Sequence, residues 1–127
     1  MLSEATRQVT DKALESFVQQ TVELAGRALQ EIILFGSWAR GDASDESDVD
    51  LLIVLEGDGA LREAVRTLRT DLIIETDVIV SLVFMSPEQY AVEVRRSTSF
   101  MRFVIEEGRT LYDRNDAEPD NEVQGVC

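Results

Sequence analysis

The sequence lacks histidine altogether and contains a single cysteine, Cys127. Histidine is the base of Ser–His and Cys–His nucleophiles and a common zinc ligand, so its absence excludes all of those sites. One cysteine makes neither an internal disulfide nor a zinc knuckle, and a free thiol is typical of a reducing compartment. Any chemistry must therefore use carboxylates or bound cations.

Long apolar runs and basic residues are scarce as well. The longest nearly apolar stretch, residues 78–85, is interrupted by Ser81 and is far shorter than the ~20 residues that span a bilayer. The N-terminus has no apolar region of the kind found in signal peptides, so we expect a cytoplasmic protein. Twelve Lys and Arg residues face 25 Asp and Glu residues, and the formal net charge of −13 argues against a broad cationic surface for nucleic acid.

Enough apolar material remains for the core of one domain, since 44% of the 127 residues are hydrophobic. Periodicity and turn residues predict a helix over residues 3–29, a strand over 31–35, a loop with a helical turn over 36–47, a strand over 48–55, a helix around 61–72, a strand over 74–85, a helix from 86, a helix over 97–107 and a strand over 109–113. This order predicts an α/β (α+β) fold with a small mixed β-sheet packed against helices. Residues 1–113 are expected to form the domain and residues 114–127 a flexible tail.

Five carboxylates lie within residues 42–50, directly before the most apolar strand of the chain. Asp48 and Asp50 are two residues apart, so on a strand their side chains leave the same face while Val49 points to the other. Two carboxylates held so close repel each other, which raises the pKa of one of them or recruits a cation. Hard oxygen ligands of this kind favour Mg²⁺ or Mn²⁺, with substrate phosphates completing the coordination.

Other interpretations of this acidic segment exist. Most acidic runs are solvated loops. A calcium EF-hand loop is excluded, because the glycine at loop position six and the closing glutamate are missing at the required offsets. Gly36–Ser37 favours a phosphate site, since a glycine and a small hydroxyl residue after a strand let the backbone approach phosphate oxygens. A Gly–Ser pair alone is more often a plain turn, but this pair is expected at the same sheet edge as Asp48 and Asp50.

Together, Gly36–Ser37, ten further residues and Asp48–Val49–Asp50 resemble the signature of the nucleotidyltransferase superfamily that includes DNA polymerase beta. The string LFGSWARGDASDESDVDLLIVL is particularly similar to that of the small prokaryotic minimal nucleotidyltransferases. The resemblance extends to the ending SFMRFVIEEGRTLYDR and so covers roughly residues 10–114. It implies a polymerase beta-like nucleotidyltransferase fold.

The resemblance also implies roles for the acids. Asp48 and Asp50 would bind two Mg²⁺ ions that bridge the nucleotide phosphates. A third carboxylate from the neighbouring strand would ligate one ion and help to deprotonate the acceptor hydroxyl. We assign it to Asp77, which is centred in the apolar string TDVIV. A buried structural role for Asp77 is an alternative, but an unpaired aspartate in so apolar a strand would be costly. Glu75, two residues earlier on the same face of that strand, is the competing choice.

Binding of the triphosphate would fall to the preceding loop. Gly36 and Ser37 would hold the β- and γ-phosphates while the α-phosphate is oriented for in-line attack and pyrophosphate leaves. Arg40 could offset the triphosphate charge, or it could pair with a nearby aspartate on the helix surface. Trp38 is expected to pack rather than to stack on a base.

Minimal nucleotidyltransferases are typically encoded beside an all-helical HEPN protein, often a ribonuclease toxin, and act as its antitoxin by transferring AMP from ATP to a tyrosine of the toxin. The resemblance therefore implies a Mg²⁺-dependent protein adenylyltransferase with ATP as substrate and a HEPN protein as partner in a hetero-oligomer. Two alternatives stay open: a small-molecule nucleotidyltransferase similar to aminoglycoside-modifying enzymes, and an antitoxin that acts by binding alone. Template-directed polymerisation is disfavoured, because so acidic a chain offers no groove for a duplex.

Overall fold

The computed structural model describes residues 3–44, 46–57 and 59–117. In these ranges the helices are α1 (Glu4–Ala25), the 3₁₀ turn η1 (Gly26–Ala28), α2 (Ser37–Arg40), α3 (Gly59–Thr76), α4 (Pro87–Arg96), α5 (Ser99–Glu107) and α6 (Arg114–Ala117). The strands are β1 (Leu29–Phe35), β2 (Val49–Leu55), β3 (Val80–Met85) and β4 (Arg109–Asp113). Up to β4, the order of helices and strands agrees with the one that the sequence predicts.

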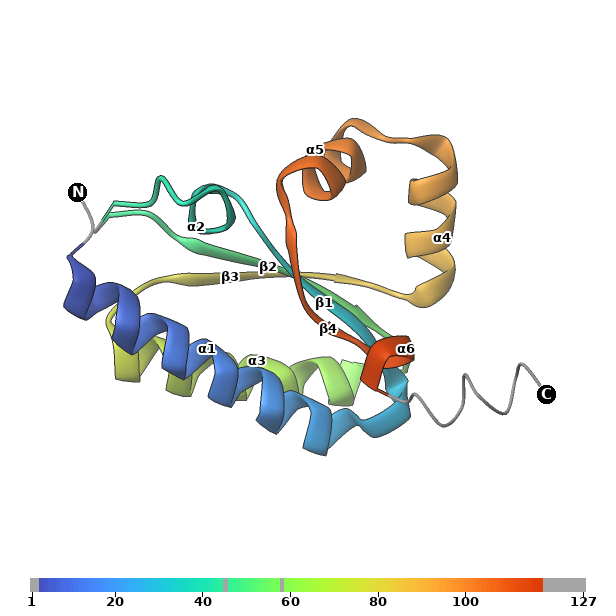
Figure 1. Ribbon diagram of the computed structural model, residues 1–127. Coiled ribbons are helices and arrows are strands. Elements are labelled where there is room, and N and C mark those ends of the chain that lie inside the picture. The colour runs from blue at the N-terminus through green and yellow to red at the C-terminus, as the bar shows by residue number, and fades with distance from the viewer. Residues whose placement is uncertain (1–2, 45, 58, 118–127) are drawn as a thin grey trace.

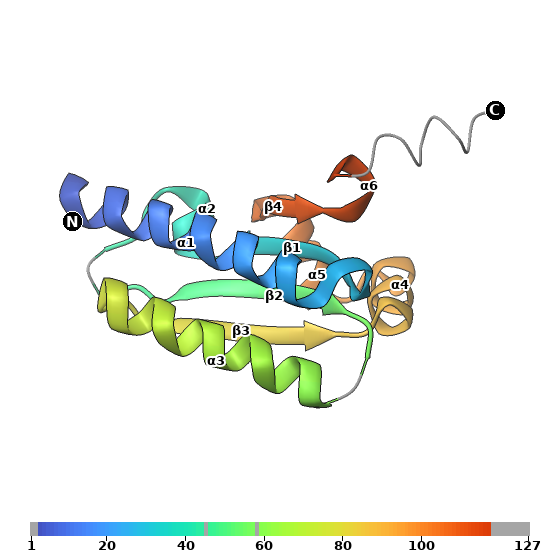
Figure 2. The ribbon, with the colours of Figure 1, turned by 90° about the horizontal axis from the view of Figure 1, so that it is seen from below.

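The strands found in the described ranges form one mixed sheet in the order β3-β2-β1-β4. β1 runs antiparallel to β2 and to β4, whereas β2 and β3 are parallel. A parallel pair needs a crossover connection, which α3 supplies between β2 and β3. Figure 2 shows α1 and α3 lying side by side across one face of the sheet. The predicted α+β fold, with a small mixed sheet packed against helices, is confirmed.

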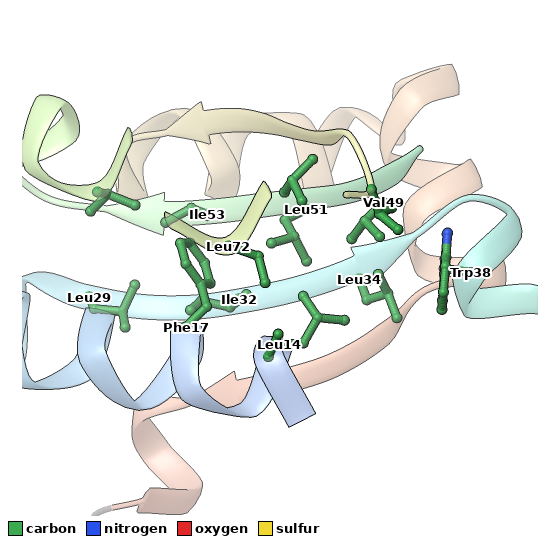
Figure 3. Packing of buried hydrophobic residues seen from close by; sticks show 14 of the residues in the cluster. Leu14, Phe17, Leu29, Ile32, Leu34, Trp38, Val49, Leu51, Ile53 and Leu72 are labelled. Carbon is green, nitrogen blue, oxygen red and sulfur yellow. The ribbon is translucent and has the colours of Figure 1, made fainter. Parts of the chain in front are cut away.

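Helices cover both faces of this sheet, with α1 and α3 on one side and α4 and α5 on the other (Figure 1). Because strand side chains alternate, β2 contributes to two apolar clusters. Leu51 shares the larger cluster with Phe17 of α1 and Leu72 of α3 (Figure 3), and Leu52 belongs to the smaller cluster beneath α5. Every residue of β2 except Asp50 is buried. β2 is thus the central strand that its apolar run predicts.

Two predicted boundaries are wrong. α1 ends at Ala25 rather than near Leu29, because Gly26 turns the chain with a φ of 56°. The strand expected from residue 74 begins only at Val80, since α3 continues through Thr76. The amide of Asp77, whose φ is 58°, donates to the carbonyl of residue 73 at 2.7 Å and closes that helix. Short apolar segments fit helix and strand patterns alike, which explains the second error.

The C-terminal part of the fold runs four residues further than expected. Arg114–Ala117 form α6, and the Arg114 guanidinium donates to the carbonyl of Arg27 at 2.7 Å. Residues 118–127 of the expected tail, Cys127 included, lie outside the described residues. In the part of the chain that the structure describes, no helix is long and apolar enough to cross a membrane.

Candidate active site

Gly36 lies where the end of β1 meets the start of β2. Its φ is 80°, a conformation that favours glycine, and it is the residue at which the chain leaves β1 for α2. A Cβ atom at this position would lie 2.6 Å from Oδ2 of Asp50. Only glycine therefore lets the backbone lie this close to the Asp50 carboxylate, and the binding of phosphate by Gly36 stays a prediction.

Short-range contacts hold the loop that follows Gly36. The Gly36 carbonyl accepts hydrogen bonds from the amides of Ala39 and Arg40, both at 3.1 Å. Trp38 is buried in the larger cluster, at the end where Leu34 and Val49 lie (Figure 3). The packing role predicted for Trp38 is confirmed, and this anchor leaves Ser37 half-buried beside Gly36.

Asp50 lies on β2, on the face that strand alternation predicts, whereas Asp48 lies before the strand and not on it. Val49 is fully buried and packs toward α1 and α3, so Asp50 lies on the opposite face. There Asp50 pairs in register with Phe35 of β1, a residue of the smaller cluster. Asp48 precedes β2 and is exposed. Burial first, and then the negative charge of Asp48, raise the pKa of the Asp50 carboxyl, so the two carboxylates do interact.

The third carboxylate is not where the sequence led us to expect it. Glu75 lies in the last turn of α3 and Asp77 in the connection to β3, and both are exposed. Neither residue is on a strand face beside Asp48 and Asp50. Across residues 3–44, 46–57 and 59–117, no group of three or more His, Cys, Asp or Glu side chains could hold a metal ion. The predicted trio is therefore not assembled, because the segment that was to carry Asp77 into the sheet ends α3 instead.

Arg40 makes the surface pairing that was the alternative to phosphate binding. Its Nε lies 3.2 Å from Oδ2 of Asp42, and its Nη1 lies 3.3 Å from Oε1 of Glu107. The second pair joins α2 to the end of α5 across 67 residues of sequence. No local pattern points to Glu107 as a partner, so sequence reasoning missed it. Binding of the triphosphate by Arg40 stays a prediction.

The donor set suits a cation that is shared with a nucleotide. Asp48 and Asp50 supply carboxylate oxygens, and Mg²⁺ in proteins is usually held by one or two carboxylates together with substrate phosphates. A Cβ at residue 36 would collide with Oδ2 of Asp50, so the absence of a side chain lets the backbone of Gly36 lie against this carboxylate. The residues present therefore fit a metal–triphosphate complex at the end of the sheet where β1 ends and β2 begins.

Comparisons with known proteins identify the family of the chain. Residues 12–112 match the family described as "Nucleotidyltransferase domain". The chain is 38% identical over 102 residues to "Putative protein adenylyltransferase MJ0604" of Methanocaldococcus jannaschii. That match covers 80% of this chain and 97% of the relative.

Solved structures share the fold. A protein of Sulfolobus solfataricus described as a "putative nucleotidyltransferase" superposes with a TM-score of 0.55 at 22% identity, covering 87% of this chain and 86% of the other. A chain of a toxin–antitoxin complex crystallised with AMP-PNP superposes with a TM-score of 0.53 at 23% identity, covering 88% of this chain and 83% of the other. At these identities the likeness concerns the fold, and it agrees with the mixed α+β architecture.

Proposed function

Because the chain belongs to the nucleotidyltransferase domain family, we propose that it is a Mg²⁺-dependent protein adenylyltransferase that transfers AMP from ATP to a hydroxyl group of another protein. The approach of Gly36 to Oδ2 of Asp50 carries this proposal. It brings a backbone that can bind phosphate against a carboxylate that can bind a cation. The relative from M. jannaschii, named as a protein adenylyltransferase, supports the choice of a protein acceptor.

In this reaction the chain positions the nucleotide. The Gly36–Ser37 backbone and the Ser37 hydroxyl would donate hydrogen bonds to the β- and γ-phosphates. Asp48 and Asp50 would hold Mg²⁺, which when bound neutralises phosphate charge and polarises the α-phosphate. The acceptor oxygen then attacks the α-phosphorus in line, the bond from that phosphorus to the bridging oxygen breaks, and pyrophosphate leaves.

We further propose that the acceptor is a tyrosine of a cognate HEPN protein and that the chain acts as its antitoxin. The fold shared with a chain of a toxin–antitoxin complex is compatible with this role. The net charge of −13 also suits association with a basic partner surface.

The test is an incubation with Mg²⁺, ATP and the HEPN protein encoded next to the chain. ATP labelled at the α-phosphate should label the HEPN protein, whereas ATP labelled at the γ-phosphate should not. Replacing both Asp48 and Asp50 by Asn should reduce transfer by several orders of magnitude. Absence of label from the wild-type reaction would contradict the proposal. If the double variant still protects cells from the toxin, the chain neutralises its partner by binding alone.

A further inference from the structure

The guanidinium group of Arg40 ties the loop after β1 to the end of α5. Its Nη1 lies 3.3 Å from Oε1 of Glu107, and its Nε lies 3.2 Å from Oδ2 of Asp42. Asp42 belongs to the same loop as Arg40, whereas Glu107 is the last residue of α5. The side chains of Arg40 and Glu107 are 37% and 31% exposed, so solvent screens this pair only in part. The pair therefore links the loop to a separate part of the fold.

Glu107 is held at the place where α5 meets the sheet. A Cβ atom at the next residue, Gly108, would lie 2.9 Å from Cγ2 of Ile33, so the end of α5 packs directly on β1. Arg109 follows as the first residue of β4 and pairs with Leu34, near the end of β1. The position of Glu107 is thus set by the same strand from which the loop leaves.

The single turn of α2 transmits the position of Arg40 to Gly36 and Ser37. The carbonyl of Gly36 accepts a hydrogen bond from the amide of Arg40 at 3.1 Å. The carbonyl of Ser37 accepts one from the amide of Gly41 at 3.0 Å. Displacing Arg40 would strain or break these bonds, so the pair with Glu107 also restrains the backbone of Gly36 and Ser37.

We propose that Glu107 is a positioning residue for the nucleotide: it holds Arg40 and thereby keeps the Gly36–Ser37 backbone where it meets the β- and γ-phosphates. A loop that is already in its binding conformation costs less to order when the ligand arrives. Loss of Glu107 should therefore weaken the binding of nucleotides that carry these phosphates. The inference rests on the proposed nucleotide substrate, but not on any acceptor.

The opposite role gives the opposite result. If Glu107 competed with the triphosphate for Arg40, its removal would free the guanidinium and strengthen nucleotide binding. The sign of the change in affinity therefore distinguishes a carboxylate that positions the loop from one that blocks it.

Titrations of the isotope-labelled protein, followed by nuclear magnetic resonance, test the proposal with AMP-PNP in the presence of Mg²⁺ and with AMP. Glu107→Ala should raise the dissociation constant for AMP-PNP about threefold to tenfold. It should leave that for AMP unchanged, because AMP lacks the β- and γ-phosphates. The amide signals of Gly36 and Ser37 should also shift in the variant without nucleotide. Glu106→Ala, at the exposed neighbouring residue of α5, is the matched control and should behave like wild type in all three measurements.

A second variant tests whether Glu107 acts through Arg40. In the Arg40→Met background, Glu107→Ala should cause no further loss of affinity for AMP-PNP. Additive losses would overturn the proposal, as would unchanged or tighter binding of AMP-PNP by Glu107→Ala, or an equal loss of affinity for AMP. If the wild-type protein does not bind AMP-PNP at all, the proposed nucleotide substrate is wrong and the inference falls with it. If wild type binds and Glu107→Ala binds equally well, the inference alone is refuted.

Discussion

Two features of the structure require glycine at residue 36: the positive φ and the lack of room for a side chain beside Asp50. An alanine there would be strained at a φ of 80°, at a cost of about 1–3 kcal/mol, and would place its Cβ 2.6 Å from Oδ2 of Asp50. We predict that Gly36→Ala destabilises the fold and also lowers the affinity for an ATP analogue about tenfold or more, because the methyl group would push the Asp50 carboxylate out of place. Urea unfolding and calorimetric titration measure the two effects.

Gly41→Ala is the matched control for this prediction. Gly41 also has a positive φ, 87°, but nothing lies within 4 Å of the place where its Cβ would be. The variant should therefore lose stability through backbone strain alone, by less than Gly36→Ala, and keep its affinity for the nucleotide. Equal loss of affinity in both variants would show that loop strain, rather than the contact with Asp50, governs nucleotide binding.

The environment of Asp50 predicts that its ionised carboxylate lowers the stability of the fold, although the proposed reaction requires it. Burial, followed by the charge of Asp48, raises its pKa in the folded state, so folding favours the protonated carboxyl. That contribution is present below the unfolded-state pKa and is lost as the pH rises through the folded-state value. At neutral pH, Asp50→Asn should therefore raise the free energy of unfolding by a small amount, because solvent screens this half-exposed carboxyl, while it abolishes transfer.

The pH dependence separates this effect from a general change in charge. Urea unfolding between acidic and neutral pH should show wild type and Asp50→Asn converging at low pH, where both side chains are neutral. Asp71→Asn removes the same charge from the exposed surface of α3, a helix that covers the opposite face of the sheet from Asp50. An Asp50→Asn variant that is less stable than wild type at neutral pH would refute the prediction.

At the scale of helices and strands, α4 is joined to the sheet by a polar contact. The carboxylate of Glu31 on β1 accepts a hydrogen bond from the hydroxyl of Tyr90 on α4. Burial, then the charge of Glu31, raise the pKa of Tyr90 to about 12. Burial also raises the pKa of Glu31, and the charges of Asp113 and Asp116 add to this, while the bond from Tyr90 opposes it.

An alkaline loss of stability follows from this contact. The unfolded-state pKa of a tyrosine is about 10, so the contribution of Tyr90 is complete below pH 10 and is lost as the pH rises toward 12. Between about pH 9 and pH 11, the free energy of unfolding should fall by up to roughly 1 kcal/mol more in wild type than in Tyr90→Phe. Glu31→Gln, which removes the neighbouring charge, should shrink the difference. An equal pH dependence of the free energy of unfolding in wild type and Tyr90→Phe would contradict this prediction.

How far the sequence predicts each element depends on the range of the forces that form it. The turn at Gly36 and the alternation of Val49 and Asp50 depend on neighbouring residues, and the sequence predicts both correctly, although β2 begins at Val49 and not at Asp48. The helix that the sequence predicts from residue 86 is capped there, since the hydroxyl of Ser86 accepts a hydrogen bond from the amide of Gln89 at 3.1 Å.

The parts that were not predicted depend on tertiary packing. Burial of Leu72 against the sheet carries α3 on to Thr76, which moves Asp77 out of β3. With that boundary misplaced, the register that sets Ser81 beside Asp50 could not be derived. The pairing of Arg40 with Glu107 requires that α2 and α5 meet, and no local pattern contains that information.

For the whole molecule, the charge balance matters more than any single ion pair. The chain has 25 acidic residues and 12 basic ones. Several of the arginines contact other residues of the same chain. Arg62 and Arg66 of α3 lie 5.4 and 5.1 Å from the ring centroid of Phe84 on β3. Arg69 donates to the carbonyl of Val80 at 3.3 Å and covers part of the open edge of the sheet. These arginines stabilise the packing of α3 but leave the excess negative charge in place.

This excess predicts an unusual response to salt. The net charge of −13 on a small domain means that acidic side chains repel one another in the folded state. This repulsion is strongest at low ionic strength. Raising NaCl from about 10 mM to about 150 mM shortens the Debye length from about 30 Å to about 8 Å. The melting temperature should therefore rise by a few degrees, although the exposed pairs of Arg40 and Arg66 are weakened by the same screening. Differential scanning fluorimetry measures the shift, and a variant in which two exposed acids are replaced by Asn or Gln should show a smaller one. A melting temperature that falls with NaCl would mean that attraction within the pairs outweighs repulsion among the acids.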